Sequence, residues 1–266
     1  RHVRGSWLLG IALILLPDAV RVATYYVDRS HPAACSCTAP TPNPDSTCGT
    51  LDRPYACIQD GINRTAGGDT VIVRDGTYAE CLTINTLDGN GNSNGRTNVT
   101  IRAENSRGVT ILRDPAQAEC AARLLIWPDR DIVWFKGSIN NTLSGFKITG
   151  APDRGILFWG NGYGNRVVDA EIFGNGAAAQ FYELSDSMED SVAHDNTGDG
   201  LVVGSNAPFT TLTRVEVHSN GGTGIALHDG SDGCILTDII SRDNGGFGIY
   251  FLPNGNMLQN PTITGN

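Results

Sequence analysis

The sequence predicts an all-β protein folded as a parallel β-helix, a solenoid in which each coil contains about 21–24 residues. Gly200, Gly224 and Gly248 recur at intervals of 24 residues. Each repeated Asn lies between two short runs of alternating apolar residues, a pattern typical of strands rather than helices. The Asn residues recur at intervals of 21, 24, 24 and 22 residues, at Asn175, Asn196, Asn220, Asn244 and Asn266.

Residues 1–23 have the layout of a secretory signal peptide. Arg1 and Arg4 precede an apolar run from Trp7 to Leu16 that is too short to cross a bilayer, and small residues follow around Ala23. A buried strand or a short membrane anchor is the alternative interpretation. We therefore expect a secreted or cell-surface protein without a membrane attachment once the signal is removed.

The chain is acidic, with a formal net charge of −9 at pH 7. Proteins that bind nucleic acid without sequence preference need clustered positive charge to neutralise phosphates. We therefore expect no nucleic-acid partner.

Residues 24–68 are expected to form an N-terminal cap. Thr24 to Asp28 is typical of an edge strand, and residues 29–52 of a loop held by disulfides. The amphipathic spacing from Pro54 to Thr65 predicts a short helix, with Ile58 and Ile62 on one face. Such a helix would cover the open end of the stacked sheets.

Residues 69–266 are expected to form the β-helix itself. The first strands are predicted at 69–78, 81–84, 99–101 and 109–112. The sequence stops at Asn266, where the next Asn turn would begin, so we expect the solenoid to be truncated at its C-terminal end.

Six of the seven cysteines lie in the first half of the chain. In an exported protein they predict up to three disulfides, while Cys234, beside apolar Ile235 and Leu236, is expected to be a buried free thiol. A zinc cluster is the alternative for four of them, Cys35, Cys37, Cys48 and Cys57.

The N-terminal half resembles a known family in four short motifs. They are Tyr25-Tyr-Val-Asp28, Gly49-Thr50 with Arg53-Pro54-Tyr55, Gly68-Asp69-Thr70-Val71, and Asp75-Gly76-Thr77-Tyr78. These motifs resemble the N-terminal cap of secreted right-handed parallel β-helix proteins of the pectate-lyase-like superfamily, which includes the family-nine polysaccharide lyases. The resemblance covers roughly residues 24–266 and implies a right-handed coil.

Counting back from each Asn predicts which side chains face outward. Val215 and Val217 should point inward. Two positions before the Asn, the outward column reads Phe173, His194, His218, Arg242; four before, it reads Lys147, Glu171, Val192, Glu216, Ile240; six before, it reads Asp169, Asp190, Arg214, Asp238.

These columns place candidate acids and bases on one sheet. Lys147, His194, His218 and Arg242 are the candidate catalytic residues, with neutral His residues acting as proton acceptors. The alternative is a solvated sheet face with cross-coil charge pairs, such as Arg214 between Asp190 and Asp238.

The strand after each Asn turn carries exposed flat side chains. Trp159, Tyr182, His228 and Tyr250 are the candidate substrate-binding residues, because aromatic faces pack well against the apolar faces of sugar rings. Isolated exposed aromatic residues are also common on any protein surface.

Four aspartates near the turns, Asp190, Asp195, Asp199 and Asp243, are the candidate ligands for Ca²⁺, which binds six to eight oxygens. The resemblance implies a calcium-dependent lyase in which a Lys or Arg removes a proton next to a uronate carboxylate. In family nine that Lys would follow a strand like Asp199-Gly200-Leu-Val-Val203, where this chain has Gly204.

These features predict a monomeric, secreted protein that binds a polysaccharide, an acidic one by the resemblance. One hypothesis is cleavage by β-elimination; the other is a noncatalytic surface or adhesion protein that binds glycans. Hydrolysis is a third option, with carboxylates drawn from Glu183, Asp186 and Asp190.

Overall fold

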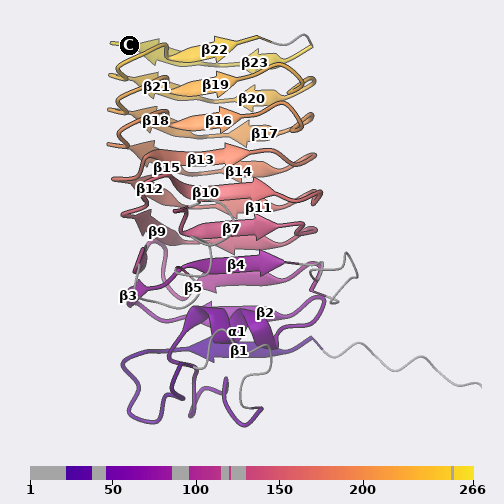
Figure 1. Cartoon of the computed structure of the whole chain (residues 1–266), viewed down its shortest axis with the longest axis vertical. Coiled ribbons are helices and arrows are strands. Elements are labelled where there is room, and N and C mark those ends of the chain that lie inside the picture. Colours follow the sequence, from indigo (N-terminus) through magenta and orange to yellow (C-terminus); the bar gives the residue numbers. More distant parts are fainter. Residues whose placement is uncertain (1–21, 38–45, 86–95, 115–119, 121–129, 253–254) are drawn as a thin grey trace, which may run out of the picture.

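The computed structural model describes residues 22–37, 46–85, 96–114, 120, 130–252 and 255–266. The predicted signal peptide therefore lies almost wholly outside the described residues. The described chain is a stack of coils whose strands form three parallel sheets, with α1 and β1 at one end and the C-terminus at the other (Figure 1). This confirms the predicted parallel β-helix.

Each complete coil contributes one strand to each sheet, in the chain order sheet A, sheet B, sheet C. Sheet A contains β1 (Thr24–Val27), β2 (Thr70–Val73), β5 (Thr100–Ala103), β8 (Thr142–Ser144), β11 (Arg166–Val168), β14 (Ser187–Glu189), β17 (Thr211–Thr213), β20 (Ile235–Thr237) and β23 (Met257–Gln259). Sheet B contains β3 (Gly76–Ala79), β6 (Val109–Leu112), β9 (Phe146–Thr149), β12 (Glu171–Phe173), β15 (Val192–His194), β18 (Glu216–His218), β21 (Ile240–Arg242) and β24 (Thr262–Thr264). Sheet C contains β4 (Leu82–Asn85), β7 (Val133–Lys136), β10 (Arg154–Trp159), β13 (Ala177–Phe181), β16 (Leu201–Val203), β19 (Ile225–Leu227) and β22 (Ile249–Phe251).

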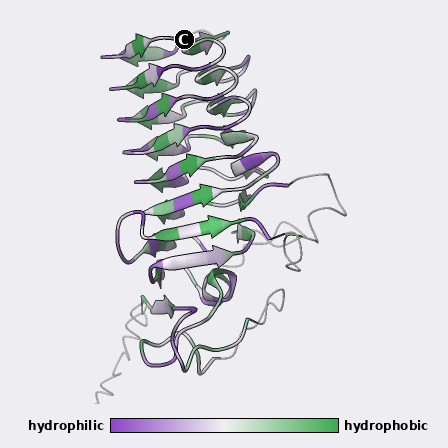
Figure 2. Cartoon of the chain, turned by 90° about the vertical axis from the view of Figure 1, so that its left-hand side faces the viewer, coloured by the Kyte–Doolittle hydropathy of each residue, from purple (hydrophilic) through white to green (hydrophobic). Residues whose placement is uncertain are grey.

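The interior of the solenoid is filled by the inward residues of all three sheets. Hydrophobic residues recur on the strands of successive coils (Figure 2). Val215 and Val217 are buried, as the count from the Asn residues predicts. Phe135, Phe158 and Phe181 stack along sheet C with ring centroids 4.5 and 4.6 Å apart. Like residues thus pack on like residues from one coil to the next.

The repeated asparagines form a hydrogen-bonded ladder at the corner between sheets B and C. The Asn196 side-chain carbonyl accepts both the backbone N–H and the amide N–H of Asn175, at 3.0 and 3.2 Å. The same two bonds recur from Asn196 to Asn220, from Asn220 to Asn244 and from Asn244 to Asn266. Because these amides are buried and paired, the ladder fixes the register of the coils.

The N-terminal cap contains the short helix α1 (Ile58–Arg64). It packs against β1, β2 and β4, so it covers the end of the sheets as predicted. It begins four residues later than expected, because the Tyr55 backbone pairs with Val27 and Cys35 instead. Buried Glu80 accepts the first helical N–H groups, those of Ile58 and Gln59, at 3.0 and 3.1 Å.

Three disulfides join Cys35 to Cys48, Cys37 to Cys57 and Cys81 to Cys120. The three predicted disulfides are confirmed, and the alternative zinc cluster is wrong because its four cysteines are all oxidised. Cys234 is a buried free thiol, also as predicted. Disulfides of this number are typical of proteins from oxidising compartments. A search of the described helices finds none that is long and apolar enough to span a membrane.

Candidate functional site

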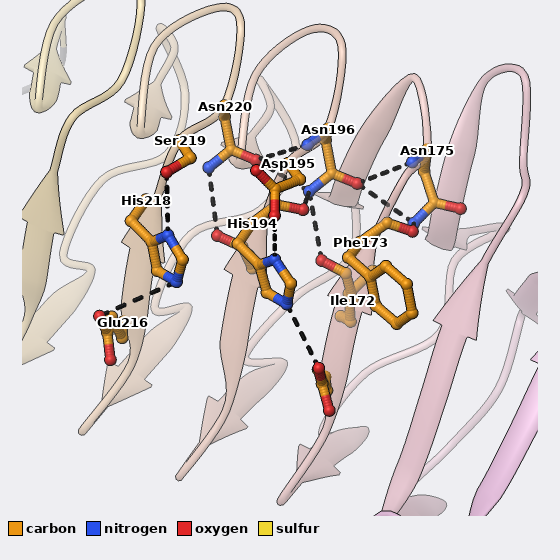
Figure 3. Close-up of polar contacts among 12 residues, drawn as sticks. Ile172, Phe173, Asn175, His194, Asp195, Asn196, Glu216, His218, Ser219 and Asn220 are labelled. Atoms are coloured by element: carbon orange, nitrogen blue, oxygen red, sulfur yellow. Dashed lines mark hydrogen bonds and ion pairs between the residues drawn. The ribbon is translucent and has the colours of Figure 1, made fainter.

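The predicted outward columns are present on sheet B, in the predicted register. Phe173 pairs with His194, His194 with His218 and His218 with Arg242 on adjacent strands. The rings of Phe173, His194 and His218 stack nearly parallel, with centroids 5.3 and 5.0 Å apart (Figure 3). Lys147, Glu171 and Glu216 lie in the neighbouring column on the same face.

Each base in these columns has a carboxylate partner. Lys147 Nζ lies 3.3 Å from Glu171 Oε2, and Arg242 Nη2 lies 2.7 Å from Glu216 Oε1. His194 places Nδ1 2.7 Å from Asp195 and Nε2 3.4 Å from Glu171 (Figure 3). The positive charges of this face are therefore already compensated.

His218 differs from His194 in its surroundings. Burial lowers the pKa of His218, and the neighbouring Arg242 lowers it further. His218 is thus neutral at neutral pH and can accept a proton. Hydrogen bonds to Glu216 and Asp243 raise the pKa of Arg242, so this side chain fits the neutralisation of a carboxylate and not proton removal.

The four aspartates predicted to bind calcium do not converge. Asp190, Asp195 and Asp243 occupy turn positions with φ of 51–55°, which Asp tolerates better than most residues. Asp195 and Asp243 lie two coils apart, about 10 Å by the strand spacing, while Asp190 lies at the opposite end of β15.

Each of these aspartates also has a nearer partner. Asp190 pairs with Arg214, Asp195 with His194 and Asp243 with Arg242, and Asp199 accepts the Thr223 N–H at 2.7 Å. Within the described residues no three His, Cys, Asp or Glu side chains form a group that could hold a metal ion. The four aspartates therefore lie at separate turns with partners of their own, and the calcium site stays a prediction.

A pocket of about 760 Å³ lies at another corner, where the chain passes from sheet C to sheet A. Trp159 and Tyr163 line it and are 44% and 45% exposed, so flat aromatic faces are open to solvent. The ring of Tyr182 lies 6.3 Å from that of Trp159, at 51°. Other lining residues are polar or small: Arg154, Asn161, Gly162, Glu183, Ser205 and Asn206, besides exposed Leu184.

Two buried carboxyl groups lie at this corner. Glu183 is 2% exposed and Asp186 is fully buried. Burial, followed by the nearby Asp186, raises the pKa of Glu183 to about 8. Burial raises the pKa of Asp186 to about 7, against hydrogen bonds from Asn165 that favour its charged form. Of the two, Glu183 lines the pocket, and an acid with a strongly raised pKa in a pocket is typical of functional sites.

The single cation that lines the described part of this pocket is strongly engaged. Arg154 Nε and Nη2 contact the two carboxylate oxygens of buried Asp131 at 2.7 and 3.1 Å. Its Nη1 donates to Gln180 Oε1 at 3.3 Å. The guanidinium is therefore held in a bidentate pair at the edge of the pocket.

The structure brings together only part of the predicted substrate-binding set. Trp159, Tyr182 and His228 share one outward column at the ends of sheet C strands, with Gly204 between the last two. Tyr250 lies in the adjacent column, beside Ala226, and stacks on Phe247. Sequence reasoning missed Tyr163 and Arg154. The spacing of Tyr163 to Trp159, four residues apart around a glycine turn, was the available signal.

The candidate catalytic column and the aromatic pocket lie on different sides of the solenoid. His194 ends a strand of sheet B at the corner where sheet C begins, whereas Tyr182 follows the last residue of a sheet C strand. None of Lys147, His194, His218 and Arg242 lines the pocket. The two predicted sets therefore form two separate surfaces and not one cleft.

This fold defines a class of protein. The family described as "Right handed beta helix region" matches residues 85–238, which is more than half of the chain. The chain therefore belongs to the right-handed β-helix family, as the N-terminal resemblance implies.

Solved structures of carbohydrate-active proteins share the fold at low sequence identity. Pectate lyase Pel9A is 15% identical with a TM-score of 0.60, over 84% of this chain and 54% of its own. The A-module of the Azotobacter vinelandii mannuronan C-5 epimerase AlgE4 is 14% identical with a TM-score of 0.51, over 75% of this chain and 59% of its own. The pectin methylesterase from Aspergillus niger is 13% identical with a TM-score of 0.55, over 80% and 84%.

The chain spans less than two thirds of the length of the first two of these proteins. Among curated protein sequences none matches the chain. The likeness to lyases, epimerases and esterases therefore concerns the fold that they share.

Proposed function

We propose that this chain is a secreted, monomeric β-helix protein that binds a polysaccharide through the pocket of Trp159, Tyr163 and Tyr182. The observation that carries the proposal is the gathering of three aromatic side chains around one pocket with polar groups at its edge. Aromatic faces bury the apolar face of a sugar ring, while Ser205 and Asn206 can bond its hydroxyls.

Substitution of the exposed indole tests this proposal. Trp159→Ala removes the largest exposed aromatic face, so we expect at least a tenfold loss of affinity, on the order of 1.4 kcal/mol. Affinity electrophoresis with neutral and acidic polysaccharides, pectate and alginate included, measures it. Phe247→Ala is the matched control, because Phe247 is 65% exposed and does not line the pocket.

The binding proposal fails if the wild-type protein retards on no polysaccharide of the panel. It also fails if Phe247→Ala weakens binding as much as Trp159→Ala, since the pocket would then not be the binding site. Circular dichroism of both variants excludes loss of the fold as the cause.

The outward face of sheet B supports a second candidate function, β-elimination on an acidic polysaccharide. Neutral His218, or Lys147, would remove the proton next to a uronate carboxylate, and Arg242 would neutralise that carboxylate. The support is their placement on one face; the pairing of both cations with glutamates counts against it.

Assays for unsaturated products separate the two functions. A lyase releases such products from pectate or alginate and loses activity in Arg242→Ala, whereas a noncatalytic glycan-binding or adhesion protein binds without product. The calcium requirement implied by the resemblance is tested in the same assay with a chelator. Activity that a chelator leaves unchanged excludes this requirement.

A further inference from the structure

We infer that the aromatic pocket takes an uncharged sugar residue in preference to a uronate, and that Glu183 determines this choice by presenting a carboxylic acid to the sugar. The inference rests on the proposed glycan binding at this pocket. It adds a ligand class and a specificity-determining residue to that proposal.

The geometry of Glu183 places its carboxyl group under the pocket. Oε1 accepts the backbone N–H groups of Gly162 and Gly137, at 2.9 and 3.3 Å. A Cβ at position 162 would meet Glu183 Oε2 and the Ser138 backbone, so only glycine fits here, and both Gly162 and Glu183 line the pocket. The two backbone bonds fix the carboxyl, and the Asn165 amide contacts its second oxygen at 3.3 Å.

The groups around Glu183 favour a proton on it. Asp186 lies on the same loop, and the Asn165 amide lies 3.3 Å from Glu183 Oε2 and 3.1 Å from Asp186 Oδ1. The other titratable or charged groups at the pocket are Arg154, Tyr163 and Tyr182. Two acids that share one amide donor in a buried site resist carrying two negative charges.

Asp186 supplies independent evidence of a bound proton. Its Oδ2 is buried and has no hydrogen-bond donor among the described residues. An ionised carboxylate would leave a charged oxygen desolvated and unsatisfied, which costs more than leaving a neutral acid there. The corner therefore holds at least one proton at neutral pH.

Among the described lining residues, a uronate would meet one cation, Arg154, whose charge is already compensated. Asp131 binds both Nε and Nη2 of Arg154, and the acid Glu183 lines the same pocket. Bringing a sugar carboxylate here would cost its hydration without a compensating cation. An uncharged ring with hydroxyl groups meets the aromatic faces and a hydrogen-bonding acid instead.

The proton gives the pocket a pH dependence of defined sign. A bound sugar removes water from Glu183, which disfavours its charged form further. Binding therefore requires the protonated acid, so affinity is full below the pKa of about 8 and is lost above it. With that pKa, affinity falls about tenfold between pH 7 and pH 9.

Calorimetric titration with neutral galactan and glucan oligosaccharides and with oligogalacturonate, from pH 6 to 9.5, tests the inference. The wild-type protein should bind a neutral oligosaccharide at least tenfold more tightly than the uronate at pH 6.5, and lose about tenfold by pH 9. Glu183→Gln should retain the pH 6.5 affinity and show no loss, because Gln is an isosteric mimic of the neutral acid. Asp186→Asn should move the loss to lower pH, since it removes the neighbouring negative charge.

The outcomes separate this inference from the proposed function. Tighter uronate binding, or an identical pH profile in Glu183→Gln, overturns the inference while Trp159-dependent binding leaves the proposed function standing. Absence of binding to every oligosaccharide removes both. A Glu183→Gln variant that does not fold still leaves the wild-type pH profile, and a flat profile overturns the inference.

Discussion

Two side-chain ladders run along the solenoid, one at the corner between sheets B and C and one at the corner between sheets C and A. The first consists of Asn alone, from Asn175 to Asn266. The second is mixed, and its equivalent positions are Asn141, Asn165, Asp186, Thr210, Cys234 and Asn256. The same corner geometry thus accommodates a uniform column and a varied one.

The mixed ladder lies where the pocket is. As in the uniform ladder, the backbone N–H of Asn165 donates to the side chain at the equivalent position of the next coil, Asp186 Oδ1, at 2.8 Å. Asp186 has no side-chain amide hydrogens to donate to the next coil, and Glu183 lies three residues before it in the same loop. The uniform Asn ladder stabilises the fold. In the mixed ladder, the change from Asn to Asp186 places a titratable group near the pocket.

The largest effect that would test this contrast is a break in the uniform ladder. Asn220 Oδ1 accepts two hydrogens from Asn196, and its amide donates to Ala193 and Asn244. Asn220→Ala removes these four hydrogen bonds, each worth about 1 kcal/mol, so we expect a loss of about 4 kcal/mol in the free energy of unfolding. Urea unfolding measures it.

Asn206→Ala is the control for that substitution, because Asn206 is exposed in a turn. It should change the free energy of unfolding by less than about 0.5 kcal/mol. An equal cost for both variants would mean that the buried ladder is no more important than a surface asparagine.

Completing the mixed ladder should have the opposite effect. Asp186→Asn supplies a neutral amide in place of a carboxyl whose pKa rises from 3.8 unfolded to about 7 folded. An acid with a raised pKa in the folded state lowers the free energy of unfolding as the pH rises from 3.8 to about 7. Above pH 7 this loss of stability is constant. We therefore expect Asp186→Asn to stabilise by about 4 kcal/mol at pH 8 and by less than about 1 kcal/mol at pH 4.

Unfolding by urea at both pH values measures this difference. A variant that is equally stabilised at pH 4 would show that packing, and not the ionisation of Asp186, explains the gain. A variant that is destabilised at pH 8 would show that the orphaned Oδ2 has a partner that Asn cannot replace.

The uniform ladder also explains what the sequence could predict. Because the Asn residues are regularly spaced, counting back from each one predicts the strand register. It also predicts the stacked column of Phe173, His194 and His218. Counting works there because the turn from sheet B to sheet C hardly changes in length between coils. The same repetition predicts Asp195 and Asp243 as metal ligands, and the structure adds that both have the left-handed turn conformation, which Asp tolerates.

The residues at the corner with the pocket could not be predicted by counting along the sequence. The segments between sheets C and A, 160–165, 182–186 and 204–210, differ in length, so equivalent positions do not recur at a fixed spacing. The sequence predicts Trp159 and Tyr182 as exposed aromatic residues, but Tyr163 reaches the pocket from irregular backbone and Arg154 from the first residue of β10. The raised pKa of Glu183 depends on burial, which a local pattern of residues does not reveal.

The smallest expected effect concerns Cys234, two coils beyond Asp186 in the mixed ladder. Its Sγ lies 3.1 Å from the Ser231 carbonyl, three residues earlier, and the Thr210 hydroxyl makes the same contact with Ala207 at 2.9 Å. Cys234→Thr keeps a donor for this carbonyl and repeats the neighbouring residue, so we expect a change of less than about 1 kcal/mol in the free energy of unfolding. Cys234→Val, of nearly the same shape, has no donor and leaves the buried carbonyl unpaired, so it should cost about 1 kcal/mol more than the Thr variant. Equal stabilities for the two variants would mean that the side chain at position 234 contributes by filling space and not by its hydrogen bond. Packing would then stabilise the mixed ladder in the coils after Asp186.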